Sequence, residues 1–193
     1  RSPRHRVNVN LLGNTAFSPM VRRTKALKAA EAKQLEQRCR KVIEAIPPEL
    51  YARVLQFLYT KETKSSYAIE RESPDQKRAQ KFADALRDAS KRDYLLKDTL
   101  VALQQAVVDP RFANTGWRDT INEQNYVGRS VSLTEEEVHF IAPRPQDLPE
   151  LMPAYLDASR RLLNSGVHPV IAAAVIAYPF VFLHPFTDGN GRL

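Results

Sequence analysis

The chain has 193 residues, enough for one ordinary domain with a hydrophobic core and a short appendage. With 43% hydrophobic and 26% charged residues it has the composition of a soluble globular protein, and no apolar run is long enough to cross a bilayer. The net charge of +7 permits contact with an acidic partner, while the single cysteine, Cys39, excludes an internal disulfide and fits a reducing cytoplasm.

The first half of the chain is mainly helical in its periodicity. Residues 1–20 are rich in breakers and predict an extended arm. Apolar residues at helical spacing predict helices over 22–45 and 49–62, separated by Pro47 and Pro48. A third helix is expected in the segment 73–91, with Ser73 as its N-cap, and a fourth over 95–108.

Many of the basic residues lie before residue 42, interleaved with Ala and Leu. They indicate either contact with nucleic acid or the solvated face of an amphipathic helix. The second interpretation is favoured, because the charges spread around the helix and no DNA-reading motif is visible.

The second half of the chain changes character. A loop, a short hairpin near 124–128 and 137–141, and a Pro-rich loop are predicted before helices resume over 148–164 and 169–182. The last of these helices is apolar nearly all round, so we expect it to be the central buried helix. The predicted fold class is all-α with one small hairpin.

The segment "HPFTDGNGRL" at 184–193 carries the densest chemistry. Glycines beside an amide residue can turn backbone N–H groups toward an anion, and Arg192 can add a forked grip on a phosphate. Asp188 offers a hard oxygen to Mg²⁺, and His184 can take a proton from a hydroxyl near neutral pH. Phe186 is expected to hold the loop in the core. This set suits transfer from a nucleoside triphosphate to a hydroxyl; it is neither a Walker A loop nor a Ser-His-Asp site.

The string "HPFTDGNGR" resembles the signature of the Fic family, His-Pro-Phe-x-Asp-Gly-Asn-Gly-Arg, at each fixed position. The resemblance implies a Fic-type helical bundle with a β-hairpin flap beside the active-site loop. It also implies transfer of AMP from ATP to a Ser, Thr or Tyr hydroxyl of a target protein and of the enzyme itself. In that reaction His184 is the base, Asp188 holds Mg²⁺, and Arg192 binds the γ-phosphate. The phosphates are cradled by Gly189, Asn190 and Gly191, and the presence of Gly191 favours adenylylation over the phosphorylation of relatives that lack it.

Two further segments resemble parts of the same family. "GWRDTINEQNYVGR" and "EVHFIAPRPQDLPELM" are similar to the flap region, in which a target would add as a strand to the hairpin edge. We expect that edge at Tyr126, Val127, Gly128 and Arg129, and at 137–141.

"SSYAIERES" at 65–73 resembles the family's inhibitory segment, Ser/Thr-x-x-x-Glu followed by Gly or Asn, with Ser66 and Glu70 at the required spacing. Arg71 departs from that pattern. The resemblance implies that Glu70 pairs with Arg192 in cis and competes with the γ-phosphate, so that the bound nucleotide is turned away from in-line attack.

We expect an N-terminal arm and helices over 1–60 and a Fic domain over 61–193, whose core would continue past Leu193. ATP, Mg²⁺ and a protein substrate are the expected partners in a cytoplasmic enzyme, without membrane or nucleic acid; whether the chain forms a homo-oligomer is left open. Two alternatives remain. The chain could instead remove AMP from a modified protein, with Glu70 positioning a water, or be a non-catalytic module whose basic helix over 22–41 contacts nucleic acid.

Overall fold

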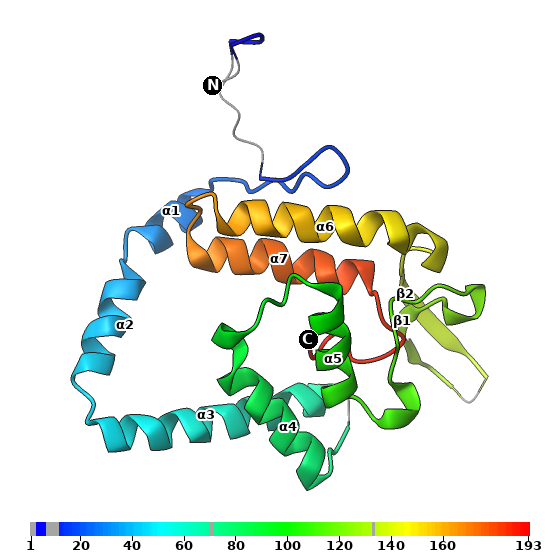
Figure 1. Ribbon diagram of the computed structural model, residues 1–193, viewed down its shortest axis with the longest axis horizontal. Coiled ribbons are helices and arrows are strands. Elements are labelled where there is room, and N and C mark those ends of the chain that lie inside the picture. The colour runs from blue at the N-terminus through cyan, green and yellow to red at the C-terminus, as the bar shows by residue number, and fades with distance from the viewer. Residues whose placement is uncertain (1–2, 7–11, 70–71, 133) are drawn as a thin grey trace. The chain divides into compact units, whose positions relative to one another are not determined.

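The computed structural model describes residues 3–6, 12–69, 72–132 and 134–193, and Figure 1 shows a mostly helical chain with one β-hairpin. The predicted fold class is confirmed. The chain divides into two compact units: Met20–Arg87, and Asp88–Leu193 together with the N-terminal segment up to Pro19. Within the described ranges, no helix has both the length and the apolar character needed to span a membrane.

The unit Met20–Arg87 contains four helices: α1 (Lys25–Glu31), α2 (Leu35–Glu44), α3 (Pro48–Ile69) and α4 (Gln76–Arg87). The prediction of one helix over 22–45 is wrong, because Gln34 adopts the left-handed conformation (φ 48°, ψ 49°) and separates α1 from α2. Ser73 is not the cap of α4. Asp75 lies directly before the first helical residue, and its Oδ1 accepts the N–H of Arg78 at 2.8 Å.

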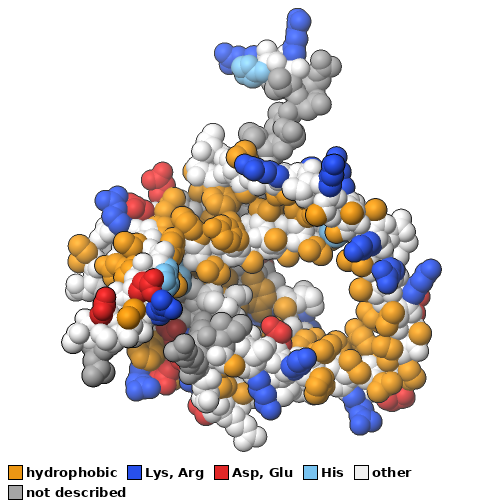
Figure 2. All heavy atoms as spheres, turned by 180° about the vertical axis from the view of Figure 1, so that it is seen from behind, with side chains coloured by type: hydrophobic (Ala, Val, Ile, Leu, Met, Phe, Trp, Pro, Cys, Tyr) orange, Lys and Arg blue, Asp and Glu red, His pale blue; other side chains and the backbone are white. Residues whose placement is uncertain are grey.

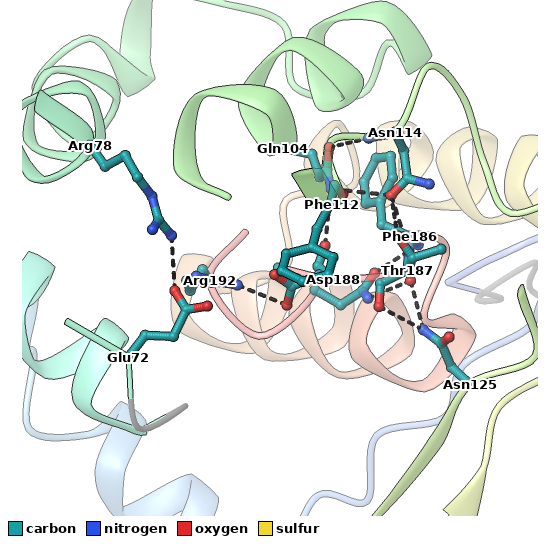
Figure 3. A network of polar contacts seen from close by, with 12 residues as sticks. Glu72, Arg78, Gln104, Phe112, Asn114, Asn125, Phe186, Thr187, Asp188 and Arg192 are labelled. Carbon is teal, nitrogen blue, oxygen red and sulfur yellow. Dashed lines mark hydrogen bonds and ion pairs between the residues drawn. The ribbon is translucent and has the colours of Figure 1, made fainter. Parts of the chain in front are cut away.

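The pairing of α3 with α4 rests on an aromatic contact near the end of α3. Tyr67 is fully buried, and its ring meets that of Phe82 edge-on at 5.8 Å between centroids. The guanidinium of Arg78 lies over the same ring at 5.4 Å and forms an ion pair with Glu72 at 2.9 Å (Figure 3). These contacts fix the last turn of α3 against α4.

The second unit carries α5 (Lys97–Val107), the hairpin, α6 (Leu148–Leu163) and α7 (Pro169–Leu183), with single 3₁₀ turns η1 (Ala89–Lys91), η2 (Pro110–Phe112), η3 (Ile121–Glu123) and η4 (Pro145–Asp147). The helices α6 and α7 lie side by side in Figure 1. One hydrophobic core joins α5, α6, α7 and the segment after α7. Its buried members are Leu100, Val101, Leu148, Met152, Tyr155, Phe180, Leu183 and Phe186.

The last helix, expected to be the central buried helix, is buried on one side only. One side of α7 packs into the core through Ile171, Phe180 and Leu183, whereas Tyr178 and Phe182 are 73% and 47% exposed. A further strip, Ala173, Ile176 and Ala177, lines an apolar cavity of about 830 Å³. Surface hydrophobic side chains are also visible from behind in Figure 2, interspersed with Lys and Arg. The apolar sequence of α7 therefore predicts a helix, but it does not predict how many sides of that helix are covered by other elements.

The hairpin consists of β1 (Tyr126–Ser130) and β2 (Glu136–Ile141), paired antiparallel. The register shifts between Val127 and Gly128, which pair with Phe140 and Val138, so His139 is the extra residue of a β-bulge. A Cβ at Gly128 would lie 2.2 Å from the carbonyl oxygen of Glu137, so this close approach of the two strands requires glycine. Among the described residues, no third strand pairs with either edge.

Candidate active site

His184 terminates α7 and begins the loop that carries the sequence motif. It adopts the left-handed conformation (φ 52°, ψ 57°), and its N–H donates to the carbonyl of Phe180 at 3.0 Å. Two residues later Phe186 is fully buried, with its ring 5.1 Å from Trp117 and 6.4 Å from Phe180. The expected role of Phe186 in holding the loop in the core is confirmed.

The His184 ring is oriented by the last turn of α7. Its Nδ1 lies 3.1 Å from the carbonyl oxygen of Val181, which can only accept, so Nδ1 carries the proton and the Nε2 lone pair is left for other chemistry. Burial lowers the pKa of His184, and the charge of Arg118 acts in the same direction; the bond to Val181 and the charge of Asp188 act against it. The net result is an imidazole that is neutral near pH 7, the state that a general base requires.

Polar side chains from other parts of the chain donate hydrogen bonds to the carbonyl groups of the motif loop. Arg118 Nε donates to the carbonyl of His184 at 2.7 Å, and Asn125 Nδ2 donates to that of Phe186 at 2.8 Å. Gln104 Nε2 reaches the carbonyl of Asp188 at 3.2 Å (Figure 3). With its carbonyls turned toward these donors, the loop is held in one backbone conformation.

Gln104 and Asn114 form a second brace beneath the loop (Figure 3). Gln104 is fully buried; its Nε2 also donates to Asn114 Oδ1 at 3.2 Å, and its Oε1 accepts the Asn114 N–H at 3.0 Å. The same Asn114 oxygen accepts both the N–H and the hydroxyl of Thr187, at 3.1 and 2.8 Å. The threonine of the motif is thus tied to α5 through two amides.

The segment 189–191 presents backbone amides at the end of the loop. Gly189 has φ +85°, and a Cβ there would lie 2.5 Å from Val108 Cγ1, so only glycine fits. The Asn190 side chain bridges across the loop, accepting from the N–H of Phe186 and donating to its carbonyl at 2.9 and 2.8 Å. The N–H groups of Asn190 and Gly191 donate to no other residue in the described part of the chain. Successive unused amides are the groups from which a backbone nest for an anion is built.

A hydrogen-bonded turn follows Gly189. Both Arg192 and Leu193 donate their N–H groups to the carbonyl of Gly189, at 3.0 and 3.3 Å. Arg192 Nη2 also lies 2.8 Å from Asp188 Oδ1, which accepts the N–H of Gly189 at 2.7 Å. The turn therefore holds the motif's cation and its carboxylate together.

Few protein groups near the motif loop could bind a metal ion. Within the described ranges, no group of three or more His, Cys, Asp or Glu side chains could enclose an ion. Asp188 is a single, 31% exposed carboxylate beside the amide nest. One carboxylate fits Mg²⁺ that takes its other oxygens from water and phosphates, and does not fit a structural metal held by protein alone.

The residues of the predicted flap edge lie on β1. Tyr126 and Val127 are 60% and 43% exposed, and Arg129 Nε forms an ion pair with Glu137 at 2.6 Å. Asn125 precedes β1 directly, and its amide binds the carbonyls of both Phe186 and Thr187. The base of the hairpin is thereby tied to the motif loop.

The two residues of the predicted inhibitory segment differ in what the structure describes. Ser66 is half-buried near the end of α3. Glu70 lies outside the described residues.

Sequence reasoning missed the four side chains that brace the loop: Gln104, Asn114, Arg118 and Asn125. One signal was available for Gln104. It lies four residues after Leu100 and three before Val107, on the buried stripe of α5, and a polar residue on such a stripe needs a buried partner. The other three lie in irregular segments, where spacing carries no such information.

Comparison with known proteins agrees with this geometry. The sequence model described as "Fic/DOC family" matches residues 94–193, just over half of the chain. The chain is 44% identical over 52 residues to a protein named protein adenylyltransferase Fic from Drosophila willistoni, and 42% identical over 52 residues to one of the same name from Nematostella vectensis. Each alignment covers 27% of this chain but only 10% and 12% of those relatives. On the family match and the motif loop, this chain belongs to the Fic/DOC family.

Proposed function

We propose that this chain transfers AMP from ATP to a Ser, Thr or Tyr hydroxyl of a protein. The observation that carries the proposal is the state of His184: its Nδ1 is bound to the carbonyl of Val181, so a neutral ring offers Nε2 at the head of the motif loop. The names of the relatives, protein adenylyltransferase, supply the chemistry that such a base would serve.

The nucleotide's phosphates would bind at the other end of the same loop. The amides of Asn190 and Gly191 suit an anion because they are not used elsewhere in the described chain. Arg192 would reach the γ-phosphate from the first turn after them, and Gly189 permits the conformation on which the nest depends. The side chain of Asn190 would act indirectly, since both of its polar atoms are engaged with Phe186.

Asp188 is the residue that would hold Mg²⁺ between these phosphates. A bound Mg²⁺ supplies charge neutralisation at the phosphate oxygens. Asp188 would meet it with the carboxylate that otherwise pairs with Arg192, and Arg192 would turn to the γ-phosphate at the same time.

The reaction follows from these positions. The target's hydroxyl oxygen attacks the α-phosphorus of ATP while His184 Nε2 takes the hydroxyl proton. A new oxygen–phosphorus bond forms, the bond between the α-phosphorus and the bridging oxygen breaks, and pyrophosphate leaves. The hydroxyl must approach in line with the leaving group, so the loop has to hold base and phosphates in fixed relation.

The target would be held by the hairpin. The exposed edge from Tyr126 through Gly128 to Arg129 has the main-chain groups that an extended peptide could pair with. Main-chain pairing would set the register of the modified residue without demanding a particular target sequence.

We also propose that Glu70 keeps this activity low in cis. A carboxylate bound to Arg192 would occupy the guanidinium that the γ-phosphate needs. ATP would then bind with its α-phosphate misplaced, and a displacement of ~1 Å can cost on the order of 100-fold in rate. The match of Ser66 and Glu70 to the family's inhibitory spacing supports this.

Labelled ATP tests the proposed function. Purified protein is incubated with Mg²⁺ and ATP carrying the label on either the α- or the γ-phosphate, with a cell lysate as the source of targets. The proposal expects labelling above that of the lysate alone from the α-position only, increased by Glu70→Gln and unchanged by Glu62→Gln, which alters an exposed carboxylate on α3. Labelling from the γ-position above that of the lysate alone would identify a kinase instead, and no added labelling by wild type or Glu70→Gln would reject the transfer.

The same variants test the alternative of AMP removal. If Glu70 positions a water for hydrolysis, Glu70→Gln would stop release of AMP from a modified protein rather than raise labelling. Measuring AMP release alongside labelling separates these outcomes.

A further inference from the structure

Arg118 is a charged side chain in the interior of the second unit. It follows Trp117 in the irregular segment between α5 and the hairpin and is 0% exposed. Its guanidinium donates to four carbonyl oxygens: Nε to His184 at 2.7 Å, Nη1 to Glu123 at 2.8 Å, and Nη2 to Pro143 at 3.1 Å and Leu183 at 3.4 Å. Its backbone N–H donates to a fifth, that of Pro185, at 2.8 Å.

No carboxylate in the described part of the chain forms an ion pair with Arg118. Glu123, the acid whose charge acts on Arg118, uses its carboxylate on the N–H groups of Asp119 and Thr120, at 2.8 and 3.2 Å. Burial lowers the pKa of Arg118, which reflects the cost of holding this charge away from water. Burying a guanidinium whose only partners are carbonyl groups costs more free energy than burying an apolar side chain of similar size. A role in packing alone therefore does not explain Arg118.

The carbonyls bound by Arg118 belong to two structures that are separate in the sequence. Glu123 and Pro143 lie on either side of the hairpin, just before β1 and just after β2. Leu183 and His184 lie where α7 ends, and His184 is there in a left-handed conformation that a non-glycine residue rarely adopts. One rigid fork thus fixes both ends of the hairpin and the strained residue that carries the imidazole.

We propose that Arg118 is the positioning residue of this site: it holds His184 in its left-handed conformation for proton transfer and keeps the hairpin in register with it. This inference rests on the proposed function for its catalytic meaning. Arg118 does not itself touch the substrate in this account; it acts through the backbone of His184 and through the two ends of the hairpin.

The inference predicts a specific kinetic signature for Arg118→Met, which keeps volume but removes the donors. Misplacing the base should lower kcat on the order of 100-fold. The KM for ATP should change little, because the nest at Gly189–Gly191 is held by Asn190 and Gln104 rather than by Arg118. Arg161→Met is the matched control, since Arg161 is 61% exposed and pairs with Asp157 on the surface of α6.

Two further variants separate positioning from folding. Arg118→Lys keeps the charge but lacks the planar fork, so it should lose most of the kcat as well. Arg118→Ala leaves a guanidinium-sized space, and low-millimolar guanidinium should restore part of its kcat while the same concentration of sodium chloride does not. If Arg118→Met does not fold, Arg118→Lys decides: a wild-type kcat in the lysine variant overturns the inference, and a large kcat loss at unchanged KM supports it.

A readout independent of activity tests the contact when the proposed function fails. Histidine NMR gives the pKa of His184, which the charge of Arg118 lowers in addition to burial, while the Val181 carbonyl and Asp188 raise it. Arg118→Met should therefore raise this pKa, whereas Arg161→Met should not. A Glu70→Gln protein that is inactive although Arg118→Met shifts the His184 pKa rejects the proposed function but keeps the positioning contact. If the wild type is active and Arg118→Met changes neither kcat nor the pKa of His184, the inference is overturned and the proposed function stands.

Discussion

Arg192 Nη2 lies 2.8 Å from Asp188 Oδ1 across one turn of backbone, and the arginine side chain is fully buried there. Both residues would bind the nucleotide in the proposed reaction, one through the γ-phosphate and one through Mg²⁺. Their pairing sets the cation and the carboxylate side by side in the motif loop.

The first prediction concerns this cation. In the Glu70→Gln background, where Glu70 does not compete for the guanidinium, Arg192→Met removes a charge-assisted contact worth about 1.5–3 kcal/mol, which corresponds to roughly 10–150-fold in affinity for ATP. Titration calorimetry of Mg²⁺-ATP measures the dissociation constant, with the exposed Arg161→Met as control. An unchanged dissociation constant in Arg192→Met would remove this residue from the phosphate site.

The second prediction concerns the nest. Gly189→Ala forces a methyl group to within 2.5 Å of Val108 Cγ1 and places alanine at φ +85°. We expect a loss of about 1–3 kcal/mol in the free energy of unfolding, measured by urea denaturation. Adding Val108→Ala should relieve the clash but not the backbone strain, so only part of the loss should return. Full recovery would contradict the assignment of strain to Gly189.

The third prediction compares neighbouring glutamines on α5. Gln104→Leu leaves buried partners, among them the carbonyl of Asp188, without their donor, at a cost of roughly 1–3 kcal/mol in unfolding free energy. Gln105→Leu is the control, because Gln105 is exposed and makes one bond, to the Asn114 carbonyl at 2.7 Å. Equal stability losses for the two variants, measured by the same urea denaturation, would mean that the brace under the loop contributes nothing.

These braces mark what sequence reasoning could and could not reach. The motif loop, the hairpin and the helices α5, α6 and α7 follow from local signals, namely spacing, glycine and turn residues. Arg118 and Asn125 act on a loop some sixty residues later, and such pairing depends on tertiary placement that no local pattern encodes. The exposed side of α7 was mispredicted for the same reason, since an apolar helix does not state how many neighbours it has.

The ends of helices are a second feature that the sequence predicts poorly. Ser73 followed by proline is an N-cap signal, yet Asp75, two residues later, caps α4. Either side chain can accept a backbone N–H, so the cap alone does not fix the first residue of the helix. That residue also depends on where the apolar face of α4 meets α3. Gln34 divides a helical pattern through a left-handed residue that propensity does not predict.

The fourth prediction is a pH dependence. Burial above all lowers the pKa of His184 below its ordinary value of 6.5. As a base the ring must be neutral, so kcat/KM for AMP transfer should fall on the acid side with an apparent pKa below 6.5. An acid limb well above this value in a pH–rate profile would mean that another group, or a charged His184, controls the reaction.

The same lowered pKa affects stability. Between the pKa of folded His184 and its ordinary value of 6.5, the unfolded chain binds more protons, so the free energy of unfolding rises with pH in that window. The contribution is complete above 6.5 and is lost as the pH falls toward the folded pKa. His184→Gln should flatten this slope in urea denaturation series, and an unaltered slope would show that His184 is not held neutral by burial.

The most direct test of the account is intact-protein mass spectrometry after incubation with ATP and Mg²⁺, comparing Glu70→Gln with the double variant Glu70→Gln/His184→Ala. We predict that Glu70→Gln gains the mass of AMP on a hydroxyl side chain and that the double variant gains none while remaining folded. Equal addition of AMP to both proteins would contradict the central claim that the His184 imidazole is the base of an AMP-transfer site.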